Sequence, residues 1–116
     1  MLAELKKQER VLIPKVKVAR NFFVRFLGLM GRTVVPRDEA VLFPKCNSIH
    51  TFFMRMSIDV VFLSKTGQVV EIRNALKPWR LLSPQKGVAH TLELGANAAG
   101  ELGIFVGDQL HCTGVF

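Results

Sequence analysis

The chain has 116 residues, of which 49% are hydrophobic and 22% are charged. That length suits one domain and leaves no room for two cores of ordinary size. The composition is that of a globular protein, so disorder is excluded for most of the chain, and folding needs neither disulfides nor metals. The sequence has no apolar run of the roughly 18 residues that a membrane-spanning helix requires.

Positive charge is concentrated in the first third of the chain. The net charge is +7; residues 1–37 contain nine Lys or Arg against two Glu, and the remainder contains seven basic and seven acidic residues. Such an asymmetry favours an anionic partner, such as nucleic acid or an acidic membrane surface. Because the basic residues are spread out rather than clustered, a solvated basic face is the favoured interpretation and nucleic acid the weaker one.

The first ten residues are charged and lack the continuous hydrophobic stretch of a secretory signal. We expect residues 1–10 to be a flexible N-terminal extension and residues 11–116 to form a single β-barrel-like domain. The expected compartment is the cytoplasm for the chain as written, and the periplasm or exterior if a leader has been removed before Met1.

The next two segments have different periodicities. Over residues 10–18, the alternation of Val and Lys predicts a half-buried strand, and Pro14 places that strand at an edge or splits it. Over residues 19–31, Phe22, Phe23 and Phe26 begin a stripe with helical spacing. This predicts a short helix that ends near a glycine and buries its aromatic rings.

The middle of the chain reads as strands. Residues 58–63 are a continuous, β-branched apolar run, and residues 64–67 form a turn in which Gly67 suits a positive φ. The two features predict a β-hairpin with residues 68–74. Shorter strands are expected at 40–43 and 50–55.

The last third alternates between strands and turns. Pro78 favours an extended connection over residues 76–80, because the residue before a proline avoids the helical region. Residues 83–87 are expected to be a loop, and Asp108 is expected to cap a turn through backbone N–H groups. The remaining expected elements are a strand at 89–94, a short helical turn at 95–102 and a final strand at 109–113. Together the elements predict a mainly β fold: a small compact β-barrel of short, mostly antiparallel strands with one or two short helices.

The most distinctive chemistry lies in residues 46–63. Cys46, His50 and Thr51 precede an aromatic pair, and Asp59 then stands inside the apolar run. A carboxylate in such a run is costly unless it is paired or hydrogen-bonded. Because positions 55 and 59 share one face of a strand, an ion pair between Arg55 and Asp59 is a candidate explanation.

Four sequence blocks resemble one family, catalogued as domain of unknown function 192 in bacteria and archaea. The blocks are residues 28–32, residues 49–55 with 58–62, residues 92–94 and residues 107–108. The resemblance covers nearly all of the chain from about residue 11. It implies a small β-barrel-like domain with little helix. It implies almost nothing about function, because the family is uncharacterised.

The candidate enzyme would use Cys46 as a nucleophile and His50 as its base. A spacing of four residues suits a helix better than a strand, so a small buried cysteine is the simpler interpretation. A zinc site made of Cys46, His50, His111 and Cys112 would have suitable ligands. However, adjacent residues of a strand point to opposite faces, so at most three could converge. We therefore expect no metal and no cofactor.

The favoured function is a non-enzymatic binding or accessory module, with a thiol-dependent or hydrolytic enzyme and a weak nucleic-acid-binding protein as alternatives. Arg side chains would hold an anionic group, and Trp79 would offer a stacking face. The partner would be a small molecule or a protein segment, and the protein a monomer or weak dimer. The candidate ligand-binding residues are His50, Thr51, Phe53, Arg55, Asp59, Trp79, Arg80 and Arg32.

Overall fold

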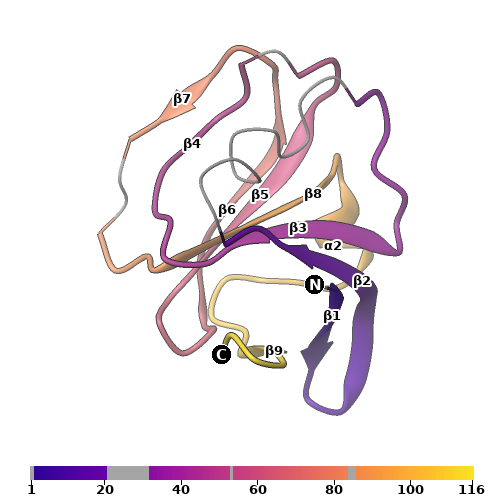
Figure 1. Cartoon of the computed structure of the whole chain (residues 1–116), viewed down its shortest axis with the longest axis vertical. Helices are drawn as coiled ribbons and strands as arrows, with labels where there is room; N and C mark the ends of the chain where they lie inside the picture. The colour runs from indigo at the N-terminus through magenta and orange to yellow at the C-terminus, as the bar shows by residue number, and fades with distance from the viewer. Residues whose placement is uncertain (1, 21–31, 53, 84–85) are drawn as a thin grey trace.

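The structure is a computed structural model, and it describes residues 2–20, 32–52, 54–83 and 86–116. One seven-stranded sheet forms most of the molecule, with strand order β6-β5-β8-β3-β2-β1-β9, and a separate ribbon pairs β4 with β7 (Figure 1). Neighbouring strands of the large sheet are antiparallel except for the parallel pair β2 and β3. The strands are β1 (Leu2–Lys7), β2 (Arg10–Val18), β3 (Glu39–Phe43), β4 (Ile49–His50), β5 (Ile58–Leu63), β6 (Val69–Leu76), β7 (Leu81–Leu82), β8 (His90–Gly95) and β9 (Leu110–Cys112).

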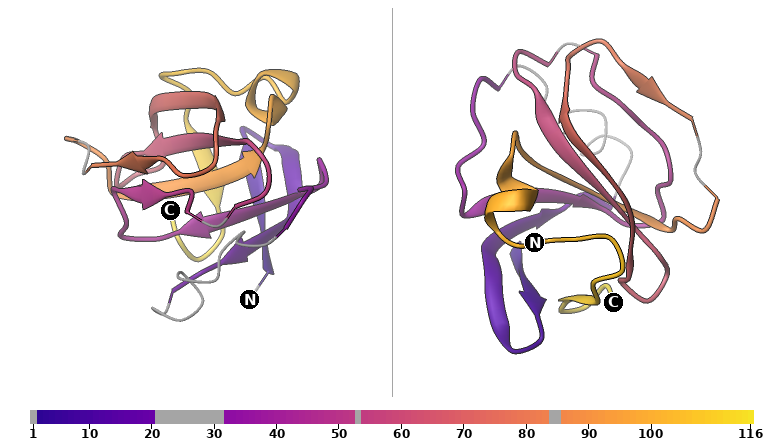
Figure 2. Two further views of the ribbon diagram at one scale, coloured as in Figure 1. Left: turned by 90° about the horizontal axis from the view of Figure 1, so that it is seen from above. Right: turned by 180° about the vertical axis from the view of Figure 1, so that it is seen from behind.

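The sheet curls until its two edge strands meet at one end. Gln68 and Gln109 form an isolated antiparallel bridge, and the Leu110 N–H donates to the Gly67 carbonyl at 2.9 Å. The β4–β7 ribbon lies at the opposite end in the view of Figure 1, and Figure 2 shows the curl from two further sides. The predicted mainly β fold is therefore confirmed, in the form of a half-barrel.

The flexible extension expected over residues 1–10 is not what the structure shows, because Leu2–Lys7 is strand β1. This strand pairs with β2 on one side and with β9 on the other. Leu5 is the fully buried residue of this strand and lies opposite Ile13 and Cys112, while Ala3 packs partly buried against the same core. β2 follows β1 in the chain after the turn at Gln8 and Glu9, whereas the curl of the sheet brings β9 beside β1.

The helix expected over residues 19–31 falls almost wholly on residues 21–31, outside the described residues. The described helix is α2 (Ala98–Glu101), a single turn within the predicted segment 95–102. Pro14 lies inside β2 where the pairing with β1 slips by one residue, between Ala3–Val16 and Leu5–Ile13. A bulge at this point lets a proline, which has no N–H, sit in a strand with two neighbours.

Strand β5 explains why the sheet has a core on each face. Every residue of β5 and β8 is buried, and successive side chains alternate between faces. Val61 and Leu63 join one apolar cluster inside the curl. Val60 and Phe62 join a second cluster, which includes Ile49 of the ribbon. The continuous apolar sequence of β5 is thus the signature of a strand covered on both sides.

Asp59 is the buried carboxylate within β5, and its partners are backbone groups. Oδ1 accepts hydrogen bonds from the N–H groups of Ala75 at 2.8 Å and Asn97 at 2.9 Å, and Oδ2 accepts one from Ala99 at 3.0 Å. These bonds join β5 to the end of β6 and to the start of α2. The pair with Arg55 considered from the sequence is not among the ion pairs of the described residues, and Arg55 is exposed.

Replacing Asp59 with Asn is expected to lower the free energy of unfolding by about 3 kcal/mol or more. The amide keeps the shape but turns an N–H donor toward N–H donors, and bonds to a charged acceptor contribute roughly 1.5–3 kcal/mol each. Urea denaturation checks this value. Asp38→Asn is the control, because Asp38 forms an exposed pair with Lys15 at 3.4 Å and should change stability by less than about 1 kcal/mol. Equal losses in the two variants would contradict the role given to Asp59.

Candidate functional site

Three aromatic side chains gather at the β4–β7 ribbon, and we call them the aromatic surface: His50, Phe52 and Trp79. The ring centroids of His50 and Phe52 are 5.1 Å apart. Phe52 stacks on Trp79 with a centroid distance of 5.8 Å and an interplanar angle of 28°. Trp79 is 58% exposed in spite of its size. Leu81 follows two residues later, on β7, where it pairs with His50, and it is 68% exposed. An exposed aliphatic side chain therefore adjoins the aromatic surface.

Thr51 fixes the loop that carries Trp79. Its side chain is fully buried, and Oγ1 donates to the Lys77 carbonyl at 2.7 Å while accepting from the Arg80 N–H at 2.8 Å. Its backbone N–H donates to the Arg80 carbonyl, and its carbonyl accepts from the Trp79 N–H at 2.9 Å. The connection between β6 and β7 is therefore tied to the end of β4 by both side-chain and main-chain bonds.

Trp79 itself has a φ of 64°, in the left-handed region that residues other than glycine rarely adopt. A strained residue of this kind persists only where its surroundings determine the conformation, and such residues cluster at functional sites. The connection over residues 76–80, expected to be extended, instead bends sharply at Pro78 and Trp79. The bend turns the indole toward Phe52 instead of into the core.

The structure unites some of the predicted binding residues and separates others. His50, Thr51, Trp79 and Arg80 lie together at the ribbon. Arg32 instead pairs with Glu39 at 3.9 Å, and Asp59 is a buried structural acceptor. Arg55 is exposed on the loop between β4 and β5, and Phe53 lies outside the described residues. Phe52 and Leu81 were missed, because nothing in their local sequence distinguishes them from core residues.

The candidate catalytic pair makes other hydrogen bonds. The Cys46 thiol donates to the Ser48 carbonyl at 3.0 Å, and His50 Nδ1 accepts from the Phe52 N–H at 3.3 Å. Burial raises the pKa of the Cys112 thiol, which disfavours the reactive thiolate. Among the described residues, no three His, Cys, Asp or Glu side chains gather in a way that could hold a metal ion.

Four of the nine basic residues in the first third pair with acids from later in the chain. Lys7 bonds Asp108 at 2.8 Å, which holds the pKa of that carboxyl below its usual value, and Arg37 bonds Glu101 at 2.5 Å. Two further pairs join Lys15 to Asp38 and Arg32 to Glu39. The charge asymmetry of the sequence is thus reduced in space, which weakens the case for a phosphate-binding face.

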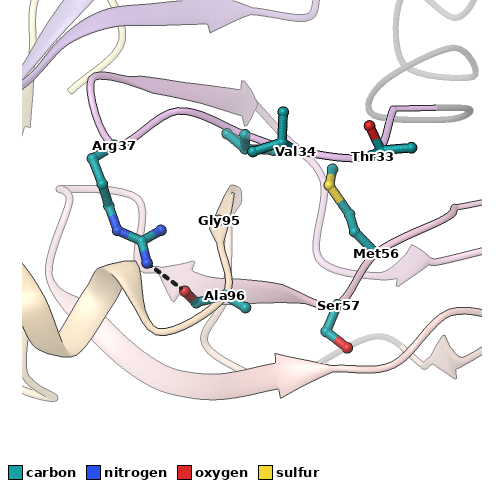
Figure 3. A pocket seen from close by; sticks show the side chains of 8 residues that line it. Thr33, Val34, Arg37, Met56, Ser57, Gly95 and Ala96 are labelled. Atoms are coloured by element: carbon teal, nitrogen blue, oxygen red, sulfur yellow. Dashed lines mark hydrogen bonds between the residues drawn. The ribbon is translucent and has the colours of Figure 1, made fainter.

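A cavity of about 290 Å³ lies between the loop after residue 32, the start of β5 and the end of β8 (Figure 3), and its lining contains no residue of the aromatic surface. None of the residues that line it was singled out from the sequence. Its apolar walls are Val34, Val35 and Met56, and Arg37 and Ser57 supply polar groups. Sequence reasoning could not find it, because three loops that are distant in the chain form it.

Glu93 is the most unusual ionisable group of the described residues. It is 2% exposed on β8, its Oε2 has no hydrogen-bond partner among the described residues, and burial raises its pKa to about 8. Its strand neighbours are Val41 and Val60, which offer no polar side chain. The carboxyl therefore holds its proton at neutral pH in the folded protein.

The fold and the site define a class: a small β half-barrel domain with an exposed aromatic surface on a two-stranded ribbon. Residues 3–112 match the model of the family called domain of unknown function 192, described as an uncharacterised ACR, and the chain belongs to that family. Among the described residues, no helix is long and apolar enough to cross a membrane.

Relatives of this chain occur among archaeal proteins named UPF0127. The one from Thermococcus sibiricus is 36% identical over 109 residues, which cover 90% of this chain and 70% of that protein. The one from Pyrococcus furiosus is 39% identical over 102 residues, covering 84% and 85%. Identity at this level over most of both chains supports the family membership.

Two bacterial crystal structures share the fold. One, from Sinorhizobium meliloti, is described as a "putative transcription regulator"; it has a TM-score of 0.86 at 22% identity and covers 98% of this chain and 95% of that one. The other, a protein of unknown function from Novosphingobium aromaticivorans, has a TM-score of 0.80 at 20% identity and covers 96% and 84%. At such low identity the likeness shows the fold alone.

Replacing Thr51 with Val should lower the free energy of unfolding by about 1–3 kcal/mol, because buried partners of the hydroxyl lose their hydrogen bonds. It should also loosen the loop that carries Trp79, the sole tryptophan, so the fluorescence anisotropy of the indole should fall. The control is Thr66→Val, since Thr66 is exposed, its hydroxyl bonds the Ser64 hydroxyl, and the Gln109 side chain donates to its main-chain carbonyl, which the variant keeps. Unchanged anisotropy in Thr51→Val would contradict the anchoring role.

Glu93 should make stability fall as pH rises. The unfolded chain releases this proton near pH 4.5, whereas the folded protein keeps it to about pH 8. Between these values the folded state binds more protons, so the free energy of unfolding should drop by about 1.4 kcal/mol per pH unit. Glu93→Gln should remove this component. Urea titrations at pH 5, 6.5 and 8 measure the difference between variant and wild type, which should grow with pH; a constant difference would contradict it.

Proposed function

We propose that this protein is a binding module that holds an extended, acidic segment of a partner protein against the aromatic surface. The observation that supports this most directly is Trp79, which is more than half exposed and yet fixed by its bend and by stacking on Phe52. A large exposed aromatic ring with a fixed conformation loses little entropy when a partner covers it. Tryptophans of this kind are enriched among the residues that dominate binding energy.

The shape of the surface favours a chain over a small molecule. Small-molecule sites are concave and enclose most of the ligand, whereas the aromatic surface is open and continues into exposed Leu81. Within the described residues, β7 pairs with β4 alone. An extended segment could therefore use both the free edge of the ribbon and the aromatic rings, as in other cases where a peptide adds to a sheet edge.

The charges around the ribbon favour an acidic segment. Lys77, Arg80 and Arg55 are all exposed on the loops that flank the aromatic surface. Residues 72–92 contain no Asp or Glu. Arg73 pairs with Glu71, whereas Lys77, Arg80 and Arg55 are in none of the ion pairs of the described residues. Arg guanidinium groups bind carboxylates with paired hydrogen bonds, which would set the direction of the bound segment.

The test is an array of ten-residue peptides with Glu, Lys or a neutral residue fixed at each position, probed with wild type and with Trp79→Ala. Acidic peptides should bind best, and Trp79→Ala should weaken their binding by roughly tenfold or more, as expected for a dominant aromatic contact. Binding should also quench the fluorescence of Trp79 in the wild type.

The matched control is Phe105→Ala. Phe105 is 61% exposed, close to the value for Trp79, but it belongs to the turn before β9 at the other end of the half-barrel. Its removal should leave peptide binding unchanged. Equal effects of Trp79→Ala and Phe105→Ala would reject the aromatic surface as the site. Binding of both heparin and acidic peptides that does not depend on Trp79 would reject it too, and would favour a general polyanion-binding face.

A further inference from the structure

The cavity beside Gly95 is a second concave feature, separate from the aromatic surface. Figure 3 shows Arg37, Ser57 and Met56 around it, with the end of β8 between them. Its volume of about 290 Å³ is close to the lower end of known small-ligand sites. One wall is apolar and the other is polar, which is the arrangement that orients a ligand with two unlike ends.

Arg37 is held in place at the polar wall. Its Nε donates to Glu101 Oε2 at 2.5 Å, and Nη2 donates to the Ala96 carbonyl at 2.9 Å. Nη1 lies directly over Gly95, because a Cβ atom on that glycine would come within 2.8 Å of it. The guanidinium is therefore fixed by two partners on one side. The described hydrogen bonds leave the two N–H donors of Nη1 available for an acceptor in the cavity.

The lack of a side chain at Gly95 has a consequence for the cavity. A Cβ atom there would also come within 2.8 Å of the Val35 carbonyl oxygen, so both the loop and the arginine approach the bare backbone of β8. Glycine does not serve a turn at this position, since its φ is not in the left-handed region. It serves the close approach of the Arg37 guanidinium to the floor of the cavity.

Arginines lie in and beside the cavity lining. Arg32 precedes Thr33 and Arg55 precedes Met56, so an exposed arginine adjoins the cavity lining on two sides. Arg32 pairs with Glu39 and Asp38 pairs with Lys15, so these charges are largely balanced. The charged residue in the cavity lining is Arg37, which pairs with Glu101. Glu101 is itself 57% exposed, so water screens its neutralising effect on Arg37. An anion is therefore favoured over a cation at this wall.

We propose that this cavity binds a small amphipathic anion, with its charged head on Arg37 Nη1. Its short apolar tail would lie against Val34, Val35 and Met56. Carboxylates and phosphate monoesters share this chemistry. Such a ligand would touch none of His50, Phe52 and Trp79, because the cavity lining contains no residue of the aromatic surface. Arg55 flanks both sites but lines neither.

The experiment titrates the full chain, labelled with ¹³C in its methionine methyl groups, with straight-chain carboxylates from butanoate to octanoate. The Met56 methyl resonance, assigned with Met56→Leu, should shift, and the buried Met54 resonance should move less. Affinity should rise by about fourfold per added methylene until the cavity is full. Alkyl phosphates form a second arm, and preference between the two arms identifies the head group.

Val34→Glu and Val106→Glu are the paired variants. Both valines are 64% exposed, so neither substitution should unfold the protein, but only Val34 lines the cavity. A carboxylate at Val34 should weaken binding of the anions by at least several fold, and the same change at Val106 should have no effect. Alkylamines of equal length should bind weakly to the wild type and better to Val34→Glu.

Three results would overturn the proposal: no Met56 shift with either anion series, equal binding of amines and carboxylates by the wild type, or equal effects of the two Val→Glu variants. Peptide binding at the aromatic surface should be unchanged in Val34→Glu. If peptides bind but small anions do not, this inference fails and the proposed function stands. If small anions bind but peptides do not, the proposed function fails and this inference stands.

Discussion

One buried carboxylate, that of Asp59, holds the end of β6 and the start of α2 against strand β5. Asp59 stands in the most apolar strand of the chain and accepts three backbone N–H groups, from Ala75, Asn97 and Ala99. Ala75 has a positive φ of 49° and ends the regular part of β6, while Asn97 and Ala99 begin the helical turn. Without this acceptor the buried N–H of Ala99 would be unsatisfied, and the part-buried N–H groups of Ala75 and Asn97 would lose their protein partner. The carboxylate is therefore costly alone but stabilising in its place.

The same principle, a buried polar side chain that satisfies a loop, recurs at the ribbon. The Thr51 hydroxyl hydrogen-bonds the backbone of the β6–β7 connection, as the Asp59 carboxylate hydrogen-bonds the backbone at Ala75. Each of these segments contains a residue with a positive φ, Trp79 in the first and Ala75 in the second. The consequence differs between the two. Asp59 keeps its loop against the core, whereas Thr51 holds a loop whose tip presents Trp79 to solvent. Rigid support beneath an exposed aromatic ring is the feature on which the binding proposal rests.

The curl of the sheet also determines which basic side chains form ion pairs within the protein and which stay exposed to solvent. The β1–β2 hairpin carries five of the 16 Lys and Arg residues, and the fold brings Lys7 beside Asp108 of the turn before β9 and Lys15 beside Asp38, just before β3. Arg37, outside this hairpin, pairs with Glu101 of the helical turn. Exposed basic groups remain at the ribbon and around the cavity. The two candidate surfaces therefore share a preference for anions but differ in shape, since one is open and aromatic and the other is concave and half apolar.

The sequence by itself determined the elements whose residues carry a local signal. The hairpin of β5 and β6, the turn at Gly67, the strand at Glu39–Phe43 and the cap by Asp108 all follow from periodicity, turn chemistry or a side chain bonding nearby backbone. It also marked His50, Thr51 and Trp79 as candidates. Tertiary structure alone decided that Leu2–Lys7 is a strand, that Asp59 is structural and that Phe52 faces Trp79. Each of these depends on a partner distant in the chain, namely Cys112 opposite Leu5, Ala75 bonded to Asp59, and Trp79 stacked on Phe52. Contacts at such separations leave no periodic trace in a single sequence.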